Sequence, residues 1–189
     1  MINKTTKPLY AVVFVGLMAA MIFVATYFLG FTIPTPAGPT MIKTANILCL
    51  LGGMLFGGLY GGLAAGIGSM LFDLLNPLYV AYAPFTLVFF FLMAFVCGLI
   101  SNSGGAKGVS FKRNIVAGVC GAVTYYVLNI GRSIVTLMLA GSAFGPAVAA
   151  NGIKFITSGI NAVIAVIFAV ILAPILKKAL IRANILAKD

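Results

Sequence analysis

Charged side chains are scarce in this sequence: they make up 7% of its 189 residues, and Asp and Glu together occur only twice. A soluble domain has roughly 25% charged residues, so this chain cannot cover a surface that faces water. Histidine is absent, which excludes a Ser–His hydrolase arrangement. Asp73 is the only acid besides the terminal Asp189, and one embedded carboxylate is too few for two-carboxylate catalysis or for an aspartate-rich metal site.

Cysteine is also sparse, and nucleotide-binding motifs are absent. Cys49, Cys97 and Cys120 all fall inside apolar runs, where cysteine behaves as a small buried hydrophobe rather than as a disulfide partner or metal ligand. No G-x-x-x-x-G-K-[ST] motif occurs, so the chain cannot hydrolyse ATP by a P-loop. The sequence therefore predicts neither an enzyme nor a bound metal or cofactor. If the chain drives uphill uptake of a solute, the energy must come from another subunit or from an ion gradient.

Long apolar stretches take the place of the missing charges. Hydrophobic residues make up 62% of the chain, and stretches of about 20 of them recur, which is typical of bilayer-spanning helices. The pattern predicts an all-α integral membrane protein with six transmembrane helices in a single membrane domain over residues 1–189. The six expected segments are 9–29, 41–56, 63–75, 83–100, 115–139 and 153–176.

Proline and glycine mark the expected turns. Three prolines within residues 31–39 prevent the first helix from continuing. The glycine-rich stretch 57–62 is predicted to be a turn, which leaves the third segment too short to cross roughly 30 Å of hydrocarbon unaided. Glycines also recur every fourth residue, at 53, 57 and 61 and at 58, 62 and 66, a spacing that lets helices approach closely in lipid.

Basic residues sort to one side of the predicted bundle. Six segments place both termini on the same side, and nine of the twelve basic residues lie at the termini or in the fourth loop: Lys4, Lys7, Lys107, Lys112, Arg113, Lys177, Lys178, Arg182 and Lys188. By the positive-inside rule, both termini are cytoplasmic. The net charge of +10 is thus interpreted as membrane orientation, with no nucleic-acid partner.

Lys43, Arg132 and Lys154 escape these clusters, and with Asp73 they are expected at the outer side of the membrane. Three of the four lie at the outer ends of their segments. Arg132 lies about 27 Å above the cytoplasmic start of its helix, at 1.5 Å per residue. Charges at such depth cost several kcal/mol unless they are paired or hydrated, so their convergence indicates a functional site.

Polar and aromatic residues near these charges complete a candidate solute-binding site. Three positive charges against one negative favour an anionic ligand group such as a carboxylate, and Arg132 suits a bidentate contact. The alternative is structural: Asp73 and Arg132 pair while Lys43 and Lys154 snorkel to the surface. The predicted binding residues are Lys43, Asn46, Asp73, Asn76, Tyr79, Tyr82, Asn129, Arg132, Lys154 and Asn161.

Several stretches resemble the substrate-binding S components of energy-coupling factor (ECF) vitamin transporters. They are residues 17–26, the loop 33–36, the glycine-rich region 55–69, Asp73-Leu74-Leu75 and Tyr82-Ala83-Pro84-Phe85-Thr86. The resemblance covers essentially the whole chain in size and six-helix layout.

The resemblance implies a multi-pass protein of the bacterial cell membrane with a vitamin pocket near its outer face, covered by the loop between helices one and two. It also implies that small residues of helix one, here Gly16, Ala19 and Ala20, dock on the transmembrane T component. The family pattern there is Ala-x-x-x-Ala, whereas this chain has Gly16-x-x-x-Ala20. Two ATPase subunits would power toppling of the S component, which supplies the energy source that the chain lacks.

The ligand stays open at this level. The positive surplus favours a small carboxylate vitamin such as pantothenate, ahead of a pyridoxine-like or hydroxymethylpyrimidine ligand. Riboflavin or cobalamin would require a larger, more aromatic pocket. Two other functions remain: a stand-alone secondary transporter, which would work without an ATPase partner, and a structural subunit that binds nothing.

Overall fold

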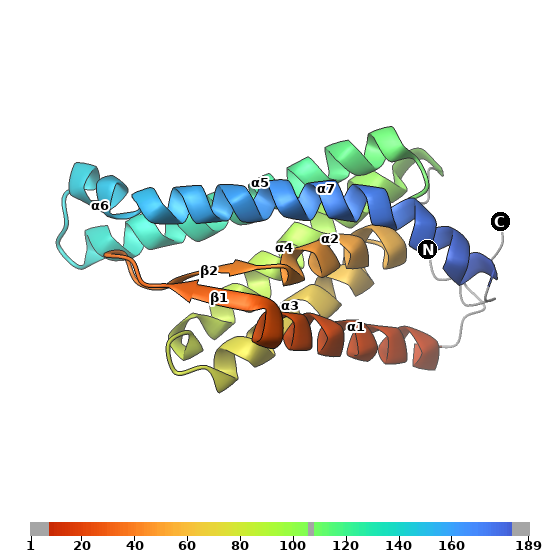
Figure 1. The fold of residues 1–189 in the computed structure, drawn as a ribbon, viewed down its shortest axis with the longest axis horizontal. Coiled ribbons are helices and arrows are strands. Elements are labelled where there is room, and N and C mark those ends of the chain that lie inside the picture. Colours follow the sequence, from red (N-terminus) through yellow and green to blue (C-terminus); the bar gives the residue numbers. More distant parts are fainter. Residues whose placement is uncertain (1–7, 106–107, 183–189) are drawn as a thin grey trace.

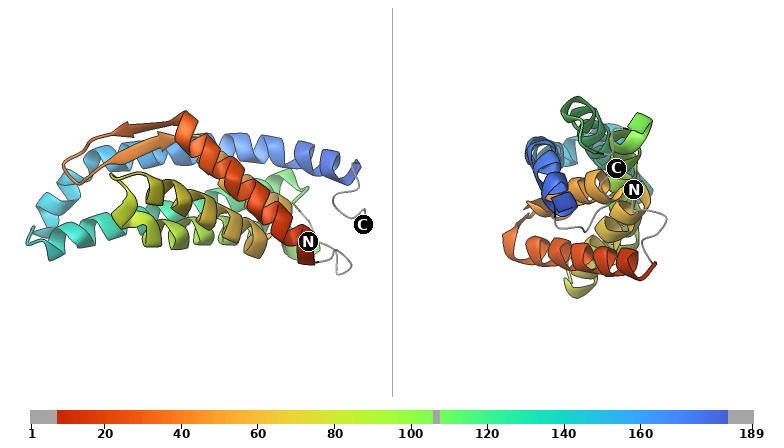
Figure 2. Two further views of the ribbon diagram at one scale, coloured as in Figure 1. Left: turned by 90° about the horizontal axis from the view of Figure 1, so that it is seen from below. Right: turned by 90° about the vertical axis from the view of Figure 1, so that its right-hand side faces the viewer.

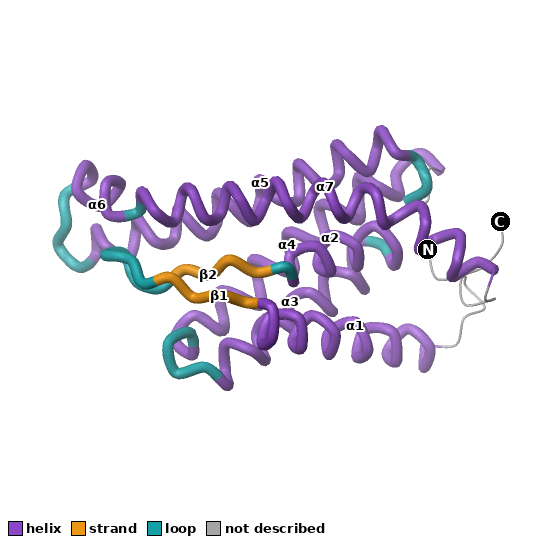
Figure 3. Tube along the Cα trace, viewed as in Figure 1, coloured by secondary structure: helices purple, strands orange, loops and turns teal. Residues whose placement is uncertain are grey.

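The computed structural model describes residues 8–105 and 108–182. Lys4, Lys7, Lys107 and Lys188, which belong to the predicted cytoplasmic clusters, lie outside the described residues. The described chain is helical apart from one β-hairpin (Figure 3). Its elements are α1 (Pro8–Leu29), β1 (Gly30–Ile33), β2 (Thr40–Lys43), α2 (Ala45–Phe56), α3 (Gly58–Leu75), η1 (Val80–Tyr82), α4 (Ala83–Asn102), η2 (Ser103–Gly105), α5 (Phe111–Leu139), α6 (Phe144–Ala150) and α7 (Gly152–Arg182).

Five helical stretches of the described residues are long and apolar enough to cross a membrane: Ala11–Leu29, Gly58–Leu75, Val80–Asn102, Phe111–Leu139 and Gly152–Arg182. α2 is also apolar but has only 12 residues. At 1.5 Å per residue it is about 18 Å long, which is less than the roughly 30 Å of bilayer hydrocarbon. The structure thus agrees with an all-α membrane protein, while the crossing of all six helices and the side of the termini stay predictions.

The expected turn over residues 57–62 is wrong. Only Gly57 breaks the chain, with a φ of 86°, and Gly58 to Gly62 form the first turns of α3. These glycines serve close packing instead: a Cβ at Gly61 would lie 2.5 Å from backbone atoms of Gly52 and Gly53 on α2. Such close backbone contact outweighs the low helix propensity of glycine when helices pack in lipid. The short helix is therefore the second one, and not the third as predicted.

Two expected loops contain regular structure. The residues after α1 form an antiparallel hairpin in which Gly30 pairs with Lys43 and Ile33 with Thr40. The three prolines fall between the strands, where they remove no ladder hydrogen bond. The loop after α5 contains α6, and the last helix continues through Pro174 to Arg182, beyond its expected end at residue 176.

α2 lies at the centre of the bundle and contacts α1, α3, α4, α5 and α7. Ten of its 12 residues are buried, among them Cys49, Leu50 and Met54, which have no exposed surface. Because its neighbours enclose it, α2 does not have to match the thickness of the bilayer. α1 begins and α7 ends at the same end of the molecule, whereas the hairpin and α6 lie toward the opposite end (Figures 1 and 2). This second end is where the predicted site residues gather.

Replacing Gly61 with alanine should lower the melting temperature (Tm) of the purified protein, because the new Cβ meets the α2 backbone. Overpacking of this kind typically costs about 1–3 kcal/mol. Gly159→Ala is the matched control, since Gly159 is also inside a helix but has nothing within 4 Å of its Cβ position. Its alanine should leave Tm unchanged or raise it. Equal Tm values for the two variants would contradict the close-contact role of Gly61.

Candidate ligand-binding site

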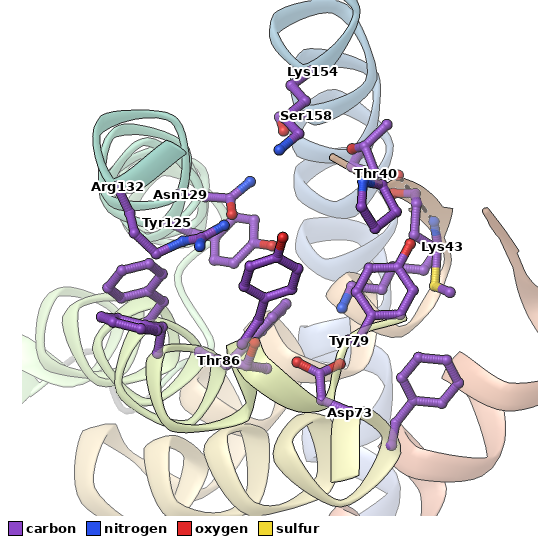
Figure 4. A pocket seen from close by; sticks show the side chains of 18 residues that line it. Thr40, Lys43, Asp73, Tyr79, Thr86, Tyr125, Asn129, Arg132, Lys154 and Ser158 are labelled. Carbon is purple, nitrogen blue, oxygen red and sulfur yellow. Dashed lines mark hydrogen bonds between the residues drawn. The ribbon is translucent and has the colours of Figure 1, made fainter. Parts of the chain in front are cut away.

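A cavity lies between β2, α3, α4, α5 and α7 (Figure 4). The space open to the centres of water-sized molecules is about 70 Å³, which is room for several waters. Its walls combine charged, amide, hydroxyl and aromatic side chains. The lining residues are Pro39, Thr40, Met41, Lys43, Phe72, Asp73, Tyr79, Tyr82, Phe85, Thr86, Phe89, Phe90, Tyr125, Asn129, Arg132, Lys154, Ser158 and Asn161.

The structure brings eight of the ten predicted binding residues to this cavity: Lys43, Asp73, Tyr79, Tyr82, Asn129, Arg132, Lys154 and Asn161. Asn46 and Asn76 do not line it. Asn46 is buried inside α2, where it is 2% exposed. Asn76 caps the end of α3, and its side-chain oxygen accepts a hydrogen bond from the Leu78 amide at 3.0 Å. The four charged residues Lys43, Asp73, Arg132 and Lys154 thus line one cavity, while their outer position and their role in binding stay predictions.

Helical spacing explains how α5 and α7 present their polar groups. Tyr125, Asn129 and Arg132 on α5 are four and then three residues apart, and all three line the cavity. Lys154, Ser158 and Asn161 repeat the same spacing on α7. Residues three and four apart share one face of an α-helix. Each long helix therefore offers one polar stripe to the cavity.

Aromatic residues form a wall of the cavity, of which only Tyr79 and Tyr82 were predicted from the sequence. Phe72, Phe85, Phe89, Phe90 and Tyr125 join Tyr79 and Tyr82, so that seven of the lining residues are aromatic. Phe85 and Phe89 are four residues apart on α4. In an apolar helix, however, the face that lines a pocket and the face that contacts lipid have similar compositions. Ser158 was expected near Lys154 from the sequence and also lines the cavity. The other lining residues not predicted are Pro39, Thr40, Met41 and Thr86.

Two of the basic residues lie over aromatic rings. Lys43 Nζ is 4.3 Å from the centroid of the Phe90 ring, and the Arg132 guanidinium is 4.4 Å from that of Tyr82. Desolvated cation–π contacts contribute about 2 kcal/mol. In the part of the chain that the structure describes, no basic side chain lies within 4.0 Å of the Asp73 carboxylate. The structural Asp73–Arg132 ion pair considered above is therefore not formed.

Lys154 joins the hairpin to two helices. Its Nζ donates hydrogen bonds to the Ala37 carbonyl at 2.6 Å and to Ser133 Oγ of α5 at 3.0 Å. Next to Ala37, Gly38 has a φ of 91°, a conformation that glycine adopts without strain. The side chain is 4% exposed, so Lys154 does not snorkel to the surface. It both lines the cavity and holds the tip of the hairpin.

The same face of α7 continues this contact along β2. The hydroxyls of Thr157 and Thr40 share a hydrogen bond at 3.1 Å. Asn161 accepts from the Lys43 amide at 3.1 Å and donates to the Met41 carbonyl at 2.7 Å. Together with Lys154, these side chains form a hydrogen-bond ladder, which fixes the hairpin as one wall of the cavity.

Two lining groups outside the membrane-spanning helices have shifted pKa values. Desolvation lowers the pKa of Lys43, and the negative charge of Asp73 opposes that shift. Burial raises the pKa of Tyr79, so its hydroxyl stays protonated at neutral pH and donates to Thr32 Oγ1 at 3.4 Å. Tyr79 thereby ties the loop after α3 to β1.

The predicted docking stripe of α1 is only partly on the surface. Gly16 and Ala20 are exposed, whereas Ala19 is 4% exposed and packs against Gly68 of α3. The outward stripe therefore consists of Gly16 and Ala20 without Ala19. An apolar groove lies beside Ala20, lined by Ala20, Met21, Val24, Ala25, Phe28, Leu29 and Leu48.

Comparison with known proteins gives one family. Residues 7–178 match the model of the ECF-type riboflavin transporter, S component. The matched range includes the α1 stripe, the hairpin and every residue that lines the cavity. No curated protein matches the chain.

Replacing Lys154 with methionine should speed hydrogen exchange of the hairpin amides by about tenfold or more, because hydrogen bonds to a charged group contribute about 1.5–3 kcal/mol each. Exchange measured by mass spectrometry over residues 34–43 checks this. Lys178→Met is the control, since Lys178 is exposed near the other end of α7. Unchanged hairpin exchange in Lys154→Met would show that the ladder does not hold the hairpin.

Proposed function

This chain belongs to the ECF-type riboflavin transporter S component family, and we propose that it captures riboflavin at the outer face of the bacterial cell membrane. As an S component it is a multi-pass membrane subunit of a vitamin transporter, and it is not an enzyme. This agrees with the resemblance seen in the sequence. We also propose that the hairpin moves when the vitamin enters and that the chain works with partner subunits.

The aromatic wall is the observation that carries the choice of vitamin. Phe90 and Tyr125 have ring centroids 4.5 Å apart, and those of Phe72 and Tyr79 are 6.1 Å apart. Aromatic side chains bind planar rings by stacked and edge-to-face contacts, and riboflavin carries a planar three-ring system. Pantothenate has no ring, so it cannot form stacked or edge-to-face contacts with this wall. The family match does not support pantothenate either, although charge alone favours it.

The size of the cavity implies that part of its wall moves when the vitamin enters. Pockets for small ligands typically measure about 300–1,000 Å³, well above the space open here. The hairpin is the wall element that can open at least cost, because side-chain hydrogen bonds rather than helix packing attach it to α7. In this proposal the ladder opens to admit riboflavin and re-forms above it.

The orientation follows from charge. Lys112, Arg113, Lys178 and Arg182 lie near the end of the molecule where α1 begins and α7 ends (Figure 1). The positive-inside rule supports a cytoplasmic position for that end. The cavity, at the opposite end, then faces outward.

The partners follow from the family and from the surface of α1. The chain has no P-loop, so an ECF T component and two ATPase subunits would supply the energy. Gly16, Ala20 and the adjacent groove give α1 a smooth apolar face, and small residues allow helices to approach closely in lipid. We assign the T component to this face. A secondary transporter would need a site for a coupling ion, and Asp73 alone offers few ligands for one.

The purified protein should bind riboflavin in preference to pantothenate, pyridoxine, hydroxymethylpyrimidine and cobalamin. Binding should raise Tm and quench flavin fluorescence, because the ring stacks on aromatic side chains. Tyr125→Leu should weaken binding by about two- to tenfold, since stacking contributes about 0.5–1.5 kcal/mol beyond burial. Tyr27→Leu, at a tyrosine that is 61% exposed on α1, is the matched control. Stabilisation by pantothenate but not by riboflavin would overturn the assignment.

A further inference from the structure

Asp73 is the one acidic side chain in the described part of the chain, and its environment is unusual. It is 4% exposed and lines the cavity near the end of α3. Thr86 lies beside it (Figure 4). No described basic side chain comes within 4.0 Å of the carboxylate. The group is thus withdrawn from bulk water without a salt bridge.

The carboxylate has more acceptor capacity than its neighbours use. An ionised carboxyl group offers about four lone-pair sites, and the single hydroxyl of Thr86 can occupy one of them. Lys43 and Arg132 act on Asp73 through space, but each has its charged group over an aromatic ring. A buried charged group that lacks hydrogen-bond donors is costly. The remaining acceptor sites of Asp73 face the cavity, where a donor from water or from a bound molecule can reach them.

The two cations define what surrounds that acceptor. Lys43 on β2 and Arg132 on α5 approach the cavity from different sides of Asp73 (Figure 4). Both carry N–H donors, so the wall presents an acceptor flanked by donors. The complement of such a wall is a ligand edge with an N–H group between two carbonyl oxygens.

We propose that Asp73 is the specificity-determining acceptor of this site and that it selects planar ligands with an N–H between two carbonyls. The inference rests on the proposed function, because the pyrimidine edge of riboflavin has this pattern at its N3–H. A carboxylate ligand would meet Asp73 with like charge and is disfavoured at this position.

The test compares riboflavin with N3-methylriboflavin, which lacks the proposed donor but keeps the ring and tail. The unmodified protein should bind the methylated compound about 10- to 100-fold more weakly, the range expected for one hydrogen bond to a charged group. In Asp73→Asn, riboflavin affinity should fall by a similar factor, and the difference between the two compounds should shrink. Fluorescence titration gives all four dissociation constants.

Leu74→Ala serves as the matched control, because Leu74 is adjacent in α3 but is 49% exposed and does not line the cavity. It should keep the preference for riboflavin over the methylated compound. Equal binding of the two compounds by the unmodified protein would overturn the role of Asp73 while leaving the riboflavin assignment intact. Binding of neither compound would overturn the proposed function and this inference with it. The comparison on unmodified protein stays decisive even if Asp73→Asn does not fold.

Discussion

Burying charge inside an apolar bundle is the constraint on which the rest of this structure depends. Lys43 and Arg132 are stabilised by aromatic faces, and Lys154 by the Ala37 carbonyl and Ser133. Asp73 lines the cavity, and no described basic side chain lies within 4.0 Å of its carboxylate. A buried polar group without partners is unfavourable, so in the proposed function a bound ligand stabilises the site. Close packing around the short central α2 brings the helices that carry these charges together.

In the proposed function, capture of the ligand and closure of the hairpin involve the same residues. Lys43, Lys154 and Asn161 all line the cavity, and all three also take part in contacts between the hairpin and α7. A ligand that contacts them acts on the ladder directly. In the proposed function, this is how an occupied site closes toward the outside before the energy from the partner subunits is used.

Part of this site could be predicted because charge is rare in the chain. Four charged residues at one depth have few ways to be satisfied, so Asp73 and Arg132 could be placed near each other from the sequence. The composition and motifs also predicted a membrane protein that is not an enzyme and that resembles ECF S components. The family match confirms this resemblance. The aromatic wall could not be separated from lipid-facing positions, because both are apolar. Gly58 was misplaced in a turn because glycine disfavours helices in water, whereas here it allows close helix contact.

Native mass spectrometry of gently purified protein tests the central claim most directly. A vitamin that is bound by the buried charges and the aromatic wall should co-purify with the protein. We expect a fraction of the molecules to be heavier by the mass of riboflavin, and we expect this fraction to disappear in Arg132→Ala protein that still folds. A bound mass corresponding to a ring-free carboxylate vitamin would contradict the account. So would riboflavin that stays bound at full occupancy after Arg132 is removed.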